Sequence, residues 1–342
     1  MRFLFIVQGE GRGHLTQALT LEDMLQRNGH EVVEVLVGKS SSRTLPGFFN
    51  RNIKAPVKRF LSPNFLPSPD NKRANLKKSF AYNLIHLPEY VRSMCYINQR
   101  IRKTGAEVVI NFYELLTGLT YMFFRPSVPY VCIGHQYLFL HREFEFPEKD
   151  AVQLFMLRLF TRMTSLKAKK RLALSFRKMS EDRENNLVVV PPLLRQEVTA
   201  IRPEAGNYIH GYMVNAGFSD SVKAFHSVHP EVPLHFFWDK ADTAEVTRMD
   251  ETLSFHQLDD VKFLNYMAGC RAYASTAGFE SICEAMYLGK PVLMVPAHIE
   301  QDCNAYDAVR AGAGIVSDSF ALEPLLRFAG KYCPSREFIY WA

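Results

Sequence analysis

The sequence lacks the features that mark several classes of protein. Its six cysteines are scattered, with no C-x-x-C pair and no cluster with histidine at metal-ligand spacing. A disulfide framework or zinc site is therefore not expected, and the thiols are interpreted as small buried apolar residues in a reducing compartment. No apolar run reaches the ~18–20 residues of a membrane span. The opening apolar stretch stops at Gln8, too early for a signal peptide. We therefore expect a cytoplasmic protein.

Charged residues are few, and the two signs are unevenly distributed. They make up 22% of the chain against 47% hydrophobic residues, which excludes extensive disorder. A length of 342 residues predicts two domains. Residues 1–200 carry 30 Lys and Arg against 17 Asp and Glu, a balance of +13, whereas residues 201–342 carry 11 against 18, a balance of −7. The basic half is expected to meet an anionic surface or substrate.

Two strand–helix–strand patterns, one in each half, indicate α/β domains with parallel sheets. The first begins with the strand Phe3–Val7, followed by a glycine-rich loop and a helix from about Leu15 to Arg27. The second begins with Asn207–Val214, after a proline-rich stretch at 191–206. We expect two Rossmann-like domains facing each other across a cleft. The predicted division is 1–195, a linker at 196–206, 207–325, and a C-terminal segment 326–342 that packs back on the first domain.

The glycine-rich loop Gly9–His14 follows the first predicted strand and opens the first helix. It does not fit the dinucleotide fingerprint G-x-G-x-x-G, because His14 stands at the third glycine position. Gly38-Lys39-Ser40 lacks the first glycine of a P-loop, so NAD and ATP are both poor candidates. The loop is instead interpreted as a tight turn that holds His14 beside an anion at a helix N-terminus. A purely structural alternative stays open, in which the glycines make the turn and His14 caps the helix.

The segment 276–305 combines residue types that suit a nucleotide ligand. Gly278 stands between a predicted strand and a helix, where backbone N–H groups can face a phosphate. Ser281 adds a hydroxyl donor in the first turn. Glu284, three residues later on the same face, can accept hydrogen bonds from two ribose hydroxyls. Glu300 and Gln301 follow the next predicted strand, at the sheet edge where ligands of α/β proteins bind.

This segment resembles the donor-binding region of GT-B glycosyltransferases, notably plant UDP-sugar glucosyltransferases and the bacterial lipid-linked GlcNAc transferase of peptidoglycan synthesis. The shared pattern is G-x-x-[ST]-x-x-E-x4-G-x-P-x4-P-x3-[DE]-Q, often followed by N-A. It is matched by Gly278, Ser281, Glu284, Gly289, Pro291, Pro296, Glu300, Gln301, Asn304 and Ala305. The opening loop is similar to the G-x-G-H-x-x-x-A start of the same families, matched by Gly11, Gly13, His14 and Ala18. Residues 40–190 match only in outline.

The resemblance implies transfer of a sugar from a nucleoside-diphosphate sugar, with a UDP-sugar as the first choice, to a hydroxyl or phosphate acceptor. It places His14 beside the acceptor, as a general base or as a residue that orients acceptor and phosphate. Gly11, Arg12 and Gly13 would form the loop around it. The donor residues that it implies are Thr276, Ala277, Gly278, Phe279 and Ser281 at the diphosphate, Glu284 at the ribose, Glu300 and Gln301 at the sugar, and Asn304.

Two departures from the family pattern affect this hypothesis. The plant enzymes have a phosphate-binding histidine where Thr276 stands, so the grip on the diphosphate must differ. They also support the N-terminal histidine with an aspartate, where Asn111 stands here. An asparagine can orient an imidazole but cannot stabilise its charged form as a carboxylate does. Glu114, three residues on, is the candidate to replace that aspartate.

No metal and no cofactor are expected, because the predicted site has no paired acids of the D-x-D type. Helix dipoles and N–H groups would then stabilise the leaving diphosphate. Two other functions stay open. A UDP-sugar 2-epimerase shares the architecture but needs acids to move a proton at C2. A non-catalytic sugar-nucleotide binding protein would hold the donor without transferring it.

Two basic stretches bear on the acceptor. Residues 51–78 hold eight basic residues and one acid, with Phe60, Phe65 and Leu66 among them. Residues 152–178 hold eight basic residues and no acid, with Phe155, Leu159 and Met163 at helical spacing. Such stretches can bind the anionic inner face of the plasma membrane and meet a lipid-linked or cell-envelope glycan acceptor. The alternative is that 152–178 is a core helix with a solvated basic face. Nucleic acid is not an expected partner.

Overall fold

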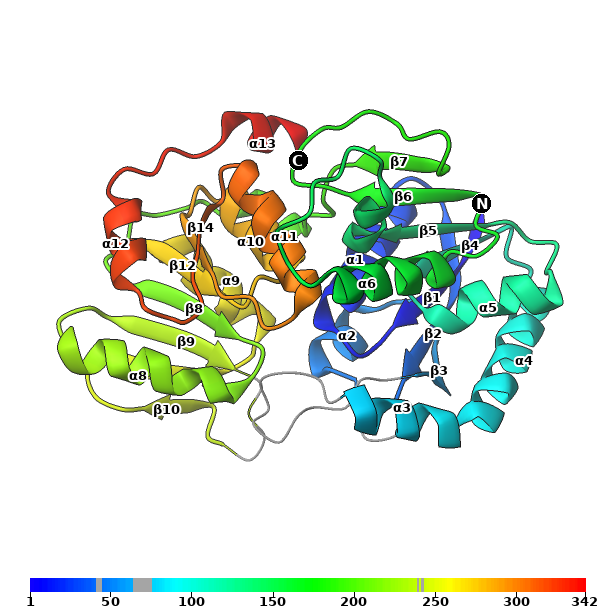
Figure 1. The fold of residues 1–342 in the computed structure, drawn as a ribbon, viewed down its shortest axis with the longest axis horizontal. Helices are drawn as coiled ribbons and strands as arrows, with labels where there is room; N and C mark the ends of the chain where they lie inside the picture. The colour runs from blue at the N-terminus through cyan, green and yellow to red at the C-terminus, as the bar shows by residue number, and fades with distance from the viewer. Residues whose placement is uncertain (41–44, 64–75, 239, 241–242) are drawn as a thin grey trace. The chain divides into compact units, whose positions relative to one another are not determined.

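The computed structural model describes residues 1–40, 45–63, 76–238, 240 and 243–342. These residues form two compact units. The N-terminal unit takes the described residues of Met1–Leu66, Asn75–Phe144 and Lys149–Leu193, and the C-terminal unit takes Glu145–Glu148 and Leu194–Ala342. Each unit is a sheet with helices (Figure 1), and each is described by itself.

The sheet of the N-terminal unit has seven strands in the order β3-β2-β1-β4-β5-β6-β7, and every neighbouring pair is parallel. Parallel strands with helical crossovers are buried on both faces, which explains the nearly unbroken apolar sequence of β1. The strands are β1 (Arg2–Gln8), β2 (Glu31–Lys39), β3 (Val57–Leu61), β4 (Val108–Phe112), β5 (Tyr130–Gly134), β6 (Lys170–Leu174) and β7 (Leu187–Val190).

The helices of the N-terminal unit lie in the crossovers between these strands (Figure 1). The strand order reverses between β1 and β4, and such a switch point is where open α/β sheets bind ligands. The helices are α1 (Arg12–Arg27), α2 (Gly47–Asn52), α3 (Leu76–Ile85), α4 (Leu87–Lys103), α5 (Leu115–Phe124), α6 (Ala151–Thr164) and the 3-10 helix η1 (His135–Leu140).

The C-terminal unit has a similar topology, with an antiparallel strand at one edge. Its sheet has the order β10-β11-β9-β8-β12-β13-β14, in which only the β10–β11 pair is antiparallel. Its switch point lies between β8 and β12. The strands are β8 (Ile209–Met213), β9 (Leu234–Trp238), β10 (Val246–Arg248), β11 (Leu253–Gln257), β12 (Ala272–Ser275), β13 (Val292–Met294) and β14 (Gly314–Val316).

The helices of this unit enclose a core built on one face of the sheet. Phe236, Phe255 and Phe320 are fully buried there. The helices are α7 (Gln196–Ala200), η2 (Ala216–Phe218), α8 (Ser219–Val228), α9 (Asp260–Gly269), α10 (Phe279–Tyr287), α11 (Ile299–Arg310), α12 (Glu323–Ala329) and α13 (Arg336–Trp341).

Several local predictions need correction. The first helix begins at Arg12 rather than Leu15, so His14 lies in its first turn. The proline-rich stretch that contains the predicted linker includes a short helix that was not predicted, α7. The last helix, α13, contacts α10, and the packing of residues 326–342 on the first domain stays a prediction. Of the six cysteines, Cys95 and Cys333 are exposed rather than buried.

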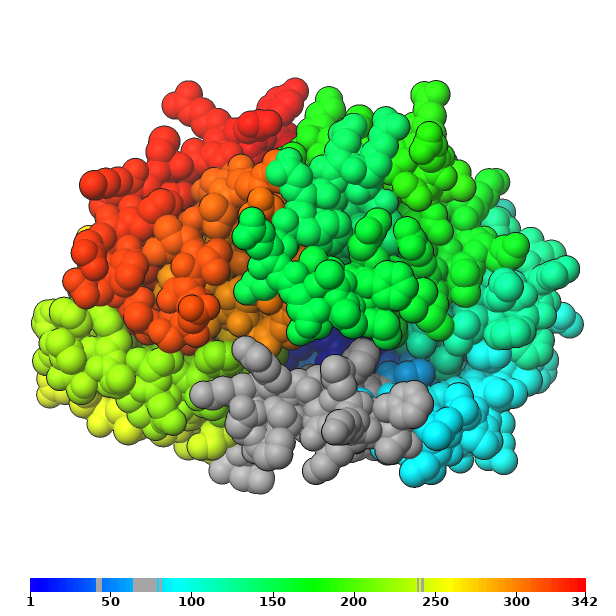
Figure 2. Space-filling model, viewed as in Figure 1, coloured from blue at the N-terminus to red at the C-terminus, as the bar shows by residue number. Residues whose placement is uncertain are grey.

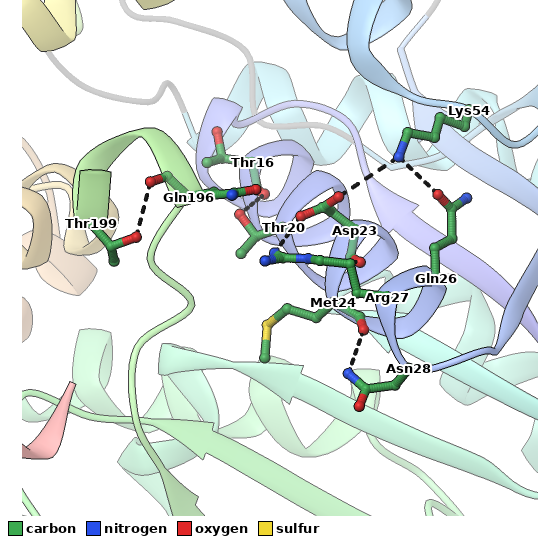
Figure 3. A network of polar contacts seen from close by, with 10 residues as sticks. All are labelled: Thr16, Thr20, Asp23, Met24, Gln26, Arg27, Asn28, Lys54, Gln196 and Thr199. Atoms are coloured by element: carbon green, nitrogen blue, oxygen red, sulfur yellow. Dashed lines mark hydrogen bonds and ion pairs between the residues drawn. The ribbon is translucent and has the colours of Figure 1, made fainter. Parts of the chain in front are cut away.

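The helix α1, which the glycine loop opens, is fixed to the segment after α2 by polar contacts (Figure 3). Lys54 pairs with Asp23 at 3.7 Å and donates to Gln26 at 2.9 Å. These side chains are largely exposed, so the pairs contribute little stability. The buried Glu22 contributes more, because its carboxylate accepts from the backbone N–H groups of Lys54 and Ala55 at 3.0 and 2.8 Å.

Three histidines lie on neighbouring strands of the C-terminal sheet, beneath α9. His210 on β8 is opposite His235 on β9, and His256 on β11 lies 5.7 Å from His235 between ring centroids. Ser254 lies within 2.8 Å of the rings of both His235 and His256. Tyr266 of α9 contacts the three imidazoles. Burial lowers the pKa of His210 to about 3 and that of His256 to about 4.

The C-terminal unit is therefore expected to lose stability in mild acid. Below about pH 6.5 His210 binds a proton in the unfolded chain, but in the folded chain it stays neutral down to about pH 3. The free energy of unfolding therefore falls as the pH is lowered from 6.5 to 3. In His210→Leu, the decrease in the free energy of unfolding between pH 7 and pH 5 should be about 2 kcal/mol smaller than in the wild type. Denaturant unfolding followed by tryptophan fluorescence measures it, since both tryptophans lie in this unit. An unchanged pH dependence in His210→Leu would contradict the prediction.

Candidate active site

The glycine loop of the N-terminal unit lies at its switch point, directly after β1. The Gly9 N–H donates to the Gly38 carbonyl at 2.7 Å, and a Cβ on Gly9 would stand 2.6 Å from Val37 Cγ1. Gly11 is the N-cap of α1 and has no side-chain capping bond. Neither Gly9, Gly11 nor Gly13 has a positive φ. At Gly9, close approach to β2 rather than a left-handed backbone therefore explains the glycine.

His14 is buried in the first turn of α1 and does not cap the helix. Its Nδ1 lies 3.4 Å from Gln17 Oε1, and its Nε2 lies 3.4 Å from the amide nitrogen of Gln136. An amide oxygen can only accept, so this arrangement puts the proton on Nδ1 and the lone pair on Nε2. Tyr113 stacks on the ring at 5.5 Å between centroids. Nε2 is therefore the atom that can take a proton.

Asn111 and Glu114 were predicted to support the imidazole of His14, but in the structure their side chains bind other groups. Asn111 is fully buried below the loop, and its amide donates to the carbonyls of Glu114 and Thr164 at 3.2 and 2.8 Å. Glu114 caps α5, where its carboxylate accepts from the Leu116 N–H and the Ser62 hydroxyl. Both side chains are thus committed to the strand–helix turn after β4.

Glu114 nonetheless stands out as a buried acid near the loop. Burial raises its pKa to about 7. A Cβ on Gly38 would lie 2.2 Å from Glu114 Oε2, so only glycine fits there. Glu114 therefore helps to shape the end of β2 on which the Gly9 turn rests.

In the C-terminal unit, the predicted donor segment lies at the second switch point. Thr276 follows β12, and its hydroxyl accepts from the Val214 N–H, after β8, at 3.2 Å. Ala277 has a φ of +51°, in the left-handed region, and its carbonyl accepts from Asn304 Nδ2 at 3.2 Å. The Tyr113 turn after β4 has the same feature, with a φ of +61°. Non-glycine residues in this region are strained, and such strain clusters at functional sites.

The predicted donor residues divide into two groups by burial. Thr276, Ala277, Phe279, Gln301 and Asn304 are buried. They build the turn, as when Gln301 Oε1 accepts from the Ala297 N–H at 2.8 Å. Gly278, Ser281 and Glu300 are partly exposed and can meet a ligand. Gly278 caps α10 without a side-chain bond, so the helix presents its positive N-terminal end there.

Glu284, the predicted ribose ligand, lies in α10 and is held by an arginine that the sequence analysis did not single out. Arg195 Nε donates to Glu284 Oε1 at 2.7 Å and its Nη2 donates to Oε2 at 2.9 Å. The side chains are 19% and 6% exposed. Spacing could not have revealed this pair, because the partners are 89 residues apart. Gln17, Tyr113 and Gln136 were likewise missed beside His14.

Within the described ranges, no group of three or more His, Cys, Asp or Glu side chains is suited to a metal ion. The candidate residues are thus the imidazole of His14 in the N-terminal unit and, in the C-terminal unit, a helix N-terminus, hydroxyls and the carboxylate of Glu284 paired with Arg195.

In both units six parallel strands run in the order 3-2-1-4-5-6, with a seventh strand at one edge and a turn at the switch point, as in the two Rossmann-like domains of GT-B glycosyltransferases. The family model "Glycosyl transferase family 1" matches residues 1–329. The chain belongs to this family and is a glycosyltransferase. The match gives no support to the 2-epimerase alternative. A search of curated proteins finds no match.

Solved structures of glycosyltransferases have the same fold. UGT89C1 of Arabidopsis thaliana, complexed with quercetin, is 14% identical, with a TM-score of 0.62 over 99% of this chain and 92% of that one. CalG4, the calicheamicin glycosyltransferase, is 16% identical, with a TM-score of 0.59 and the same coverage. SnogD of Streptomyces nogalater is 15% identical, with a TM-score of 0.57 over 99% of this chain and 93% of that one. These likenesses confirm the predicted fold class.

Proposed function

We propose that the enzyme transfers a hexose from a UDP-sugar to an acceptor hydroxyl, with the donor on the C-terminal unit. The observation that carries the proposal is the cap of α10. There Gly278 and Ser281 stand at a helix N-terminus on the switch point, with Glu284 in the same helix. UGT89C1, which has the same fold, was solved with UDP-L-rhamnose. The helix end would stabilise the diphosphate, and Glu284 would accept from the ribose.

The N-terminal unit would supply the base. The acceptor oxygen forms a bond to the anomeric carbon, the bond from that carbon to the diphosphate oxygen breaks, and UDP leaves with the bonding electrons. The acceptor proton passes to His14 Nε2, in place of the weak contact with Gln136. Gln17 holds the opposite ring nitrogen and so keeps the basic one available.

The test is a panel of UDP-, GDP- and dTDP-sugars, followed by thermal shift and by release of the nucleoside diphosphate. We expect stabilisation and slow release with UDP-sugars. The informative variant is Gly278→Ala. A Cβ there meets nothing closer than Ser281 Oγ at 3.7 Å, so the fold is kept while a methyl group intrudes on the phosphate site. Gly330→Ala, equally tolerated at 3.6 Å, is the control.

Donor binding lost in Gly278→Ala but kept in Gly330→Ala would support the site. Binding without release, even with acceptor lipids added, would favour a non-catalytic role. No response to any sugar nucleotide would refute the proposal.

The transfer is also proposed to need no metal, because the α10 N-terminus takes the place of a cation at the diphosphate. Activity should therefore change less than about twofold in excess EDTA. Strong inhibition by EDTA that a divalent ion reverses would contradict this prediction.

The helix α6 of the N-terminal unit exposes apolar residues that bear on how an acceptor is reached. Val152, Phe155 and Met156 are 69%, 59% and 55% exposed. The helix is thus not the core helix of the alternative interpretation. Its side chains lie at the surface in Figure 2. Residues 151–180 contain no acid, and Arg158 and Arg162 lie in the same helix. We propose that α6 binds an anionic membrane at the inner face of the cell, where a lipid-linked acceptor would be met.

The other basic stretch, residues 51–78, gives less support to a membrane contact. Phe60 is buried in β3, and Phe65 and Leu66 lie outside the described residues. No helix in the described part of the chain combines the length and apolarity of a bilayer span.

Vesicle sedimentation tests this surface. The protein should sediment with vesicles containing phosphatidylglycerol, not with phosphatidylcholine alone, and salt should weaken binding. Phe155→Ser/Met156→Ser should reduce binding by about tenfold or more, because two exposed apolar anchors are lost. Val228→Ser, at a 71% exposed valine of the C-terminal unit, should bind as the wild type does. Equal binding by all three proteins would exclude α6.

A further inference from the structure

Arg195 makes a largely buried, two-pronged ion pair with the carboxylate that the proposed function assigns to the donor ribose. The distances of 2.7 and 2.9 Å join two nitrogens of one guanidinium to the two oxygens of one carboxylate. This fork geometry fixes the plane of the carboxylate, which a lysine could not do. Arg195 is the N-cap of α7, and α7 contacts α10. The arginine is therefore held by the backbone as well as by its partner.

Stability alone does not account for the pair. The free energy lost when two charges leave water is about as large as the free energy gained from their attraction. An apolar pair of similar size would therefore stabilise the fold equally well. Burial opposes the charge on Arg195, but the neighbouring Glu284 outweighs it and raises the arginine's pKa. Arg195 is therefore a charged group in a largely buried place, and its partner Glu284 lies one turn from Ser281 on the helix α10.

The pair suits a ribose in two ways. Each carboxylate oxygen has two lone pairs, and Arg195 occupies one on each oxygen, which leaves one on each for a vicinal diol. A fixed carboxylate plane presents these two lone pairs side by side. The guanidinium also cancels a negative charge that would otherwise repel the nearby diphosphate.

We infer that Arg195 is a positioning residue of the donor site, which holds Glu284 in the orientation that recognises the two ribose hydroxyls of the sugar nucleotide. The inference rests on the proposed function and deepens it. It assigns the discrimination between ribose and deoxyribose to a residue outside the α10–α11 segment.

The experiment compares the affinities of UDP and 2′-deoxy-UDP for the full chain. In the wild type, UDP should bind about tenfold or more tightly than 2′-deoxy-UDP, since a hydrogen bond to a charged group is lost with the hydroxyl. In Arg195→Gln this ratio should fall to about twofold or less, mainly through weaker binding of UDP. Arg195→Lys keeps the positive charge but cannot fix the plane of the Glu284 carboxylate. It should therefore keep only part of the preference for UDP over 2′-deoxy-UDP.

A second variant separates this role from folding. Arg195→Gln leaves a buried carboxylate without its partner, whereas Arg195→Gln/Glu284→Gln replaces the ion pair with two amides. The double variant should regain thermal stability without regaining the preference for UDP. The control is Arg327→Gln, at an exposed arginine that pairs with Glu323. It should keep both the thermal stability and the preference for UDP.

The outcomes are distinct. A wild type that binds neither nucleotide refutes the proposed function, and the role of Arg195 falls with it. A wild type that prefers UDP, together with an Arg195→Gln variant that keeps the full ratio, overturns the inference alone. Recovery of the ratio in the double variant would likewise overturn it, because stability would then be all that Arg195 supplies.

Discussion

Replacing His14 with alanine is expected to lower kcat by about 10²- to 10⁴-fold and to leave the affinity for the donor nearly unchanged. The imidazole can take a proton from an acceptor hydroxyl at Nε2, where Gln136 now makes a 3.4 Å contact. Its contacts with Gln17, Tyr113 and Gln136 all lie within the N-terminal unit. Steady-state kinetics with a saturating acceptor, together with direct titration of UDP, measures both quantities.

Two further variants test the assignment of roles. Gln17→Leu removes the acceptor that holds Nδ1–H, so kcat should fall by a smaller factor, about tenfold. His30→Ala, at a partly exposed histidine of the same unit, should have no effect. A His14→Ala enzyme with full kcat would show that the base lies elsewhere and that the histidine serves the turn.

Replacing Glu284 with alanine should cost both binding and stability. The ribose would lose its acceptor, and the affinity for UDP should fall by about 10²-fold or more. Arg195, 19% exposed, would be left as a largely buried charge without this partner. Breaking such a pair typically costs about 3–5 kcal/mol. Isothermal titration with UDP and denaturant unfolding measure the two losses.

The matched control is Glu323→Ala. Glu323 pairs with Arg327 across one exposed helical turn at 3.3 Å, so its loss should change stability by less than about 0.5 kcal/mol and leave UDP binding intact. A Glu284→Ala protein that stays as stable as this control would mean that Arg195 finds water or another acceptor. Unchanged UDP affinity would remove Glu284 from the donor site.

The sequence predicted the fold well where apolar strands stood beside glycine turns. The predicted strands Phe3–Val7 and Asn207–Val214 are found as β1, Arg2–Gln8, and β8, Ile209–Met213. The helix α7 was missed, because its five residues follow two prolines and carry no apolar period. The exposed face of α6 was ambiguous for the opposite reason. A period of 3.6 shows that one face is apolar but not what covers it.

The candidate site was predictable to the extent that its residues are neighbours in the sequence. Gly278, Ser281 and Glu284 share one helix, so their spacing carried the information. The partner of Glu284 comes from another segment of the chain, and only folding brings the two together. For His14, the aspartate that the resemblance implies was sought near Asn111. The structure has Gln17 at Nδ1, from the same helix, and Gln136 at Nε2, from the distant helix η1.

The distribution of thiols has a practical consequence for spectroscopy. Four of the six cysteines are buried, while Cys95 in α4 and Cys333 ahead of α13 are exposed. One accessible thiol therefore belongs to each unit. Maleimide dyes would mark these two positions without any substitution, and burial raises the pKa of Cys132, Cys270 and Cys283, which slows their reaction further. Energy transfer between a donor dye and an acceptor dye would thus report the separation of the two units while a sugar nucleotide binds.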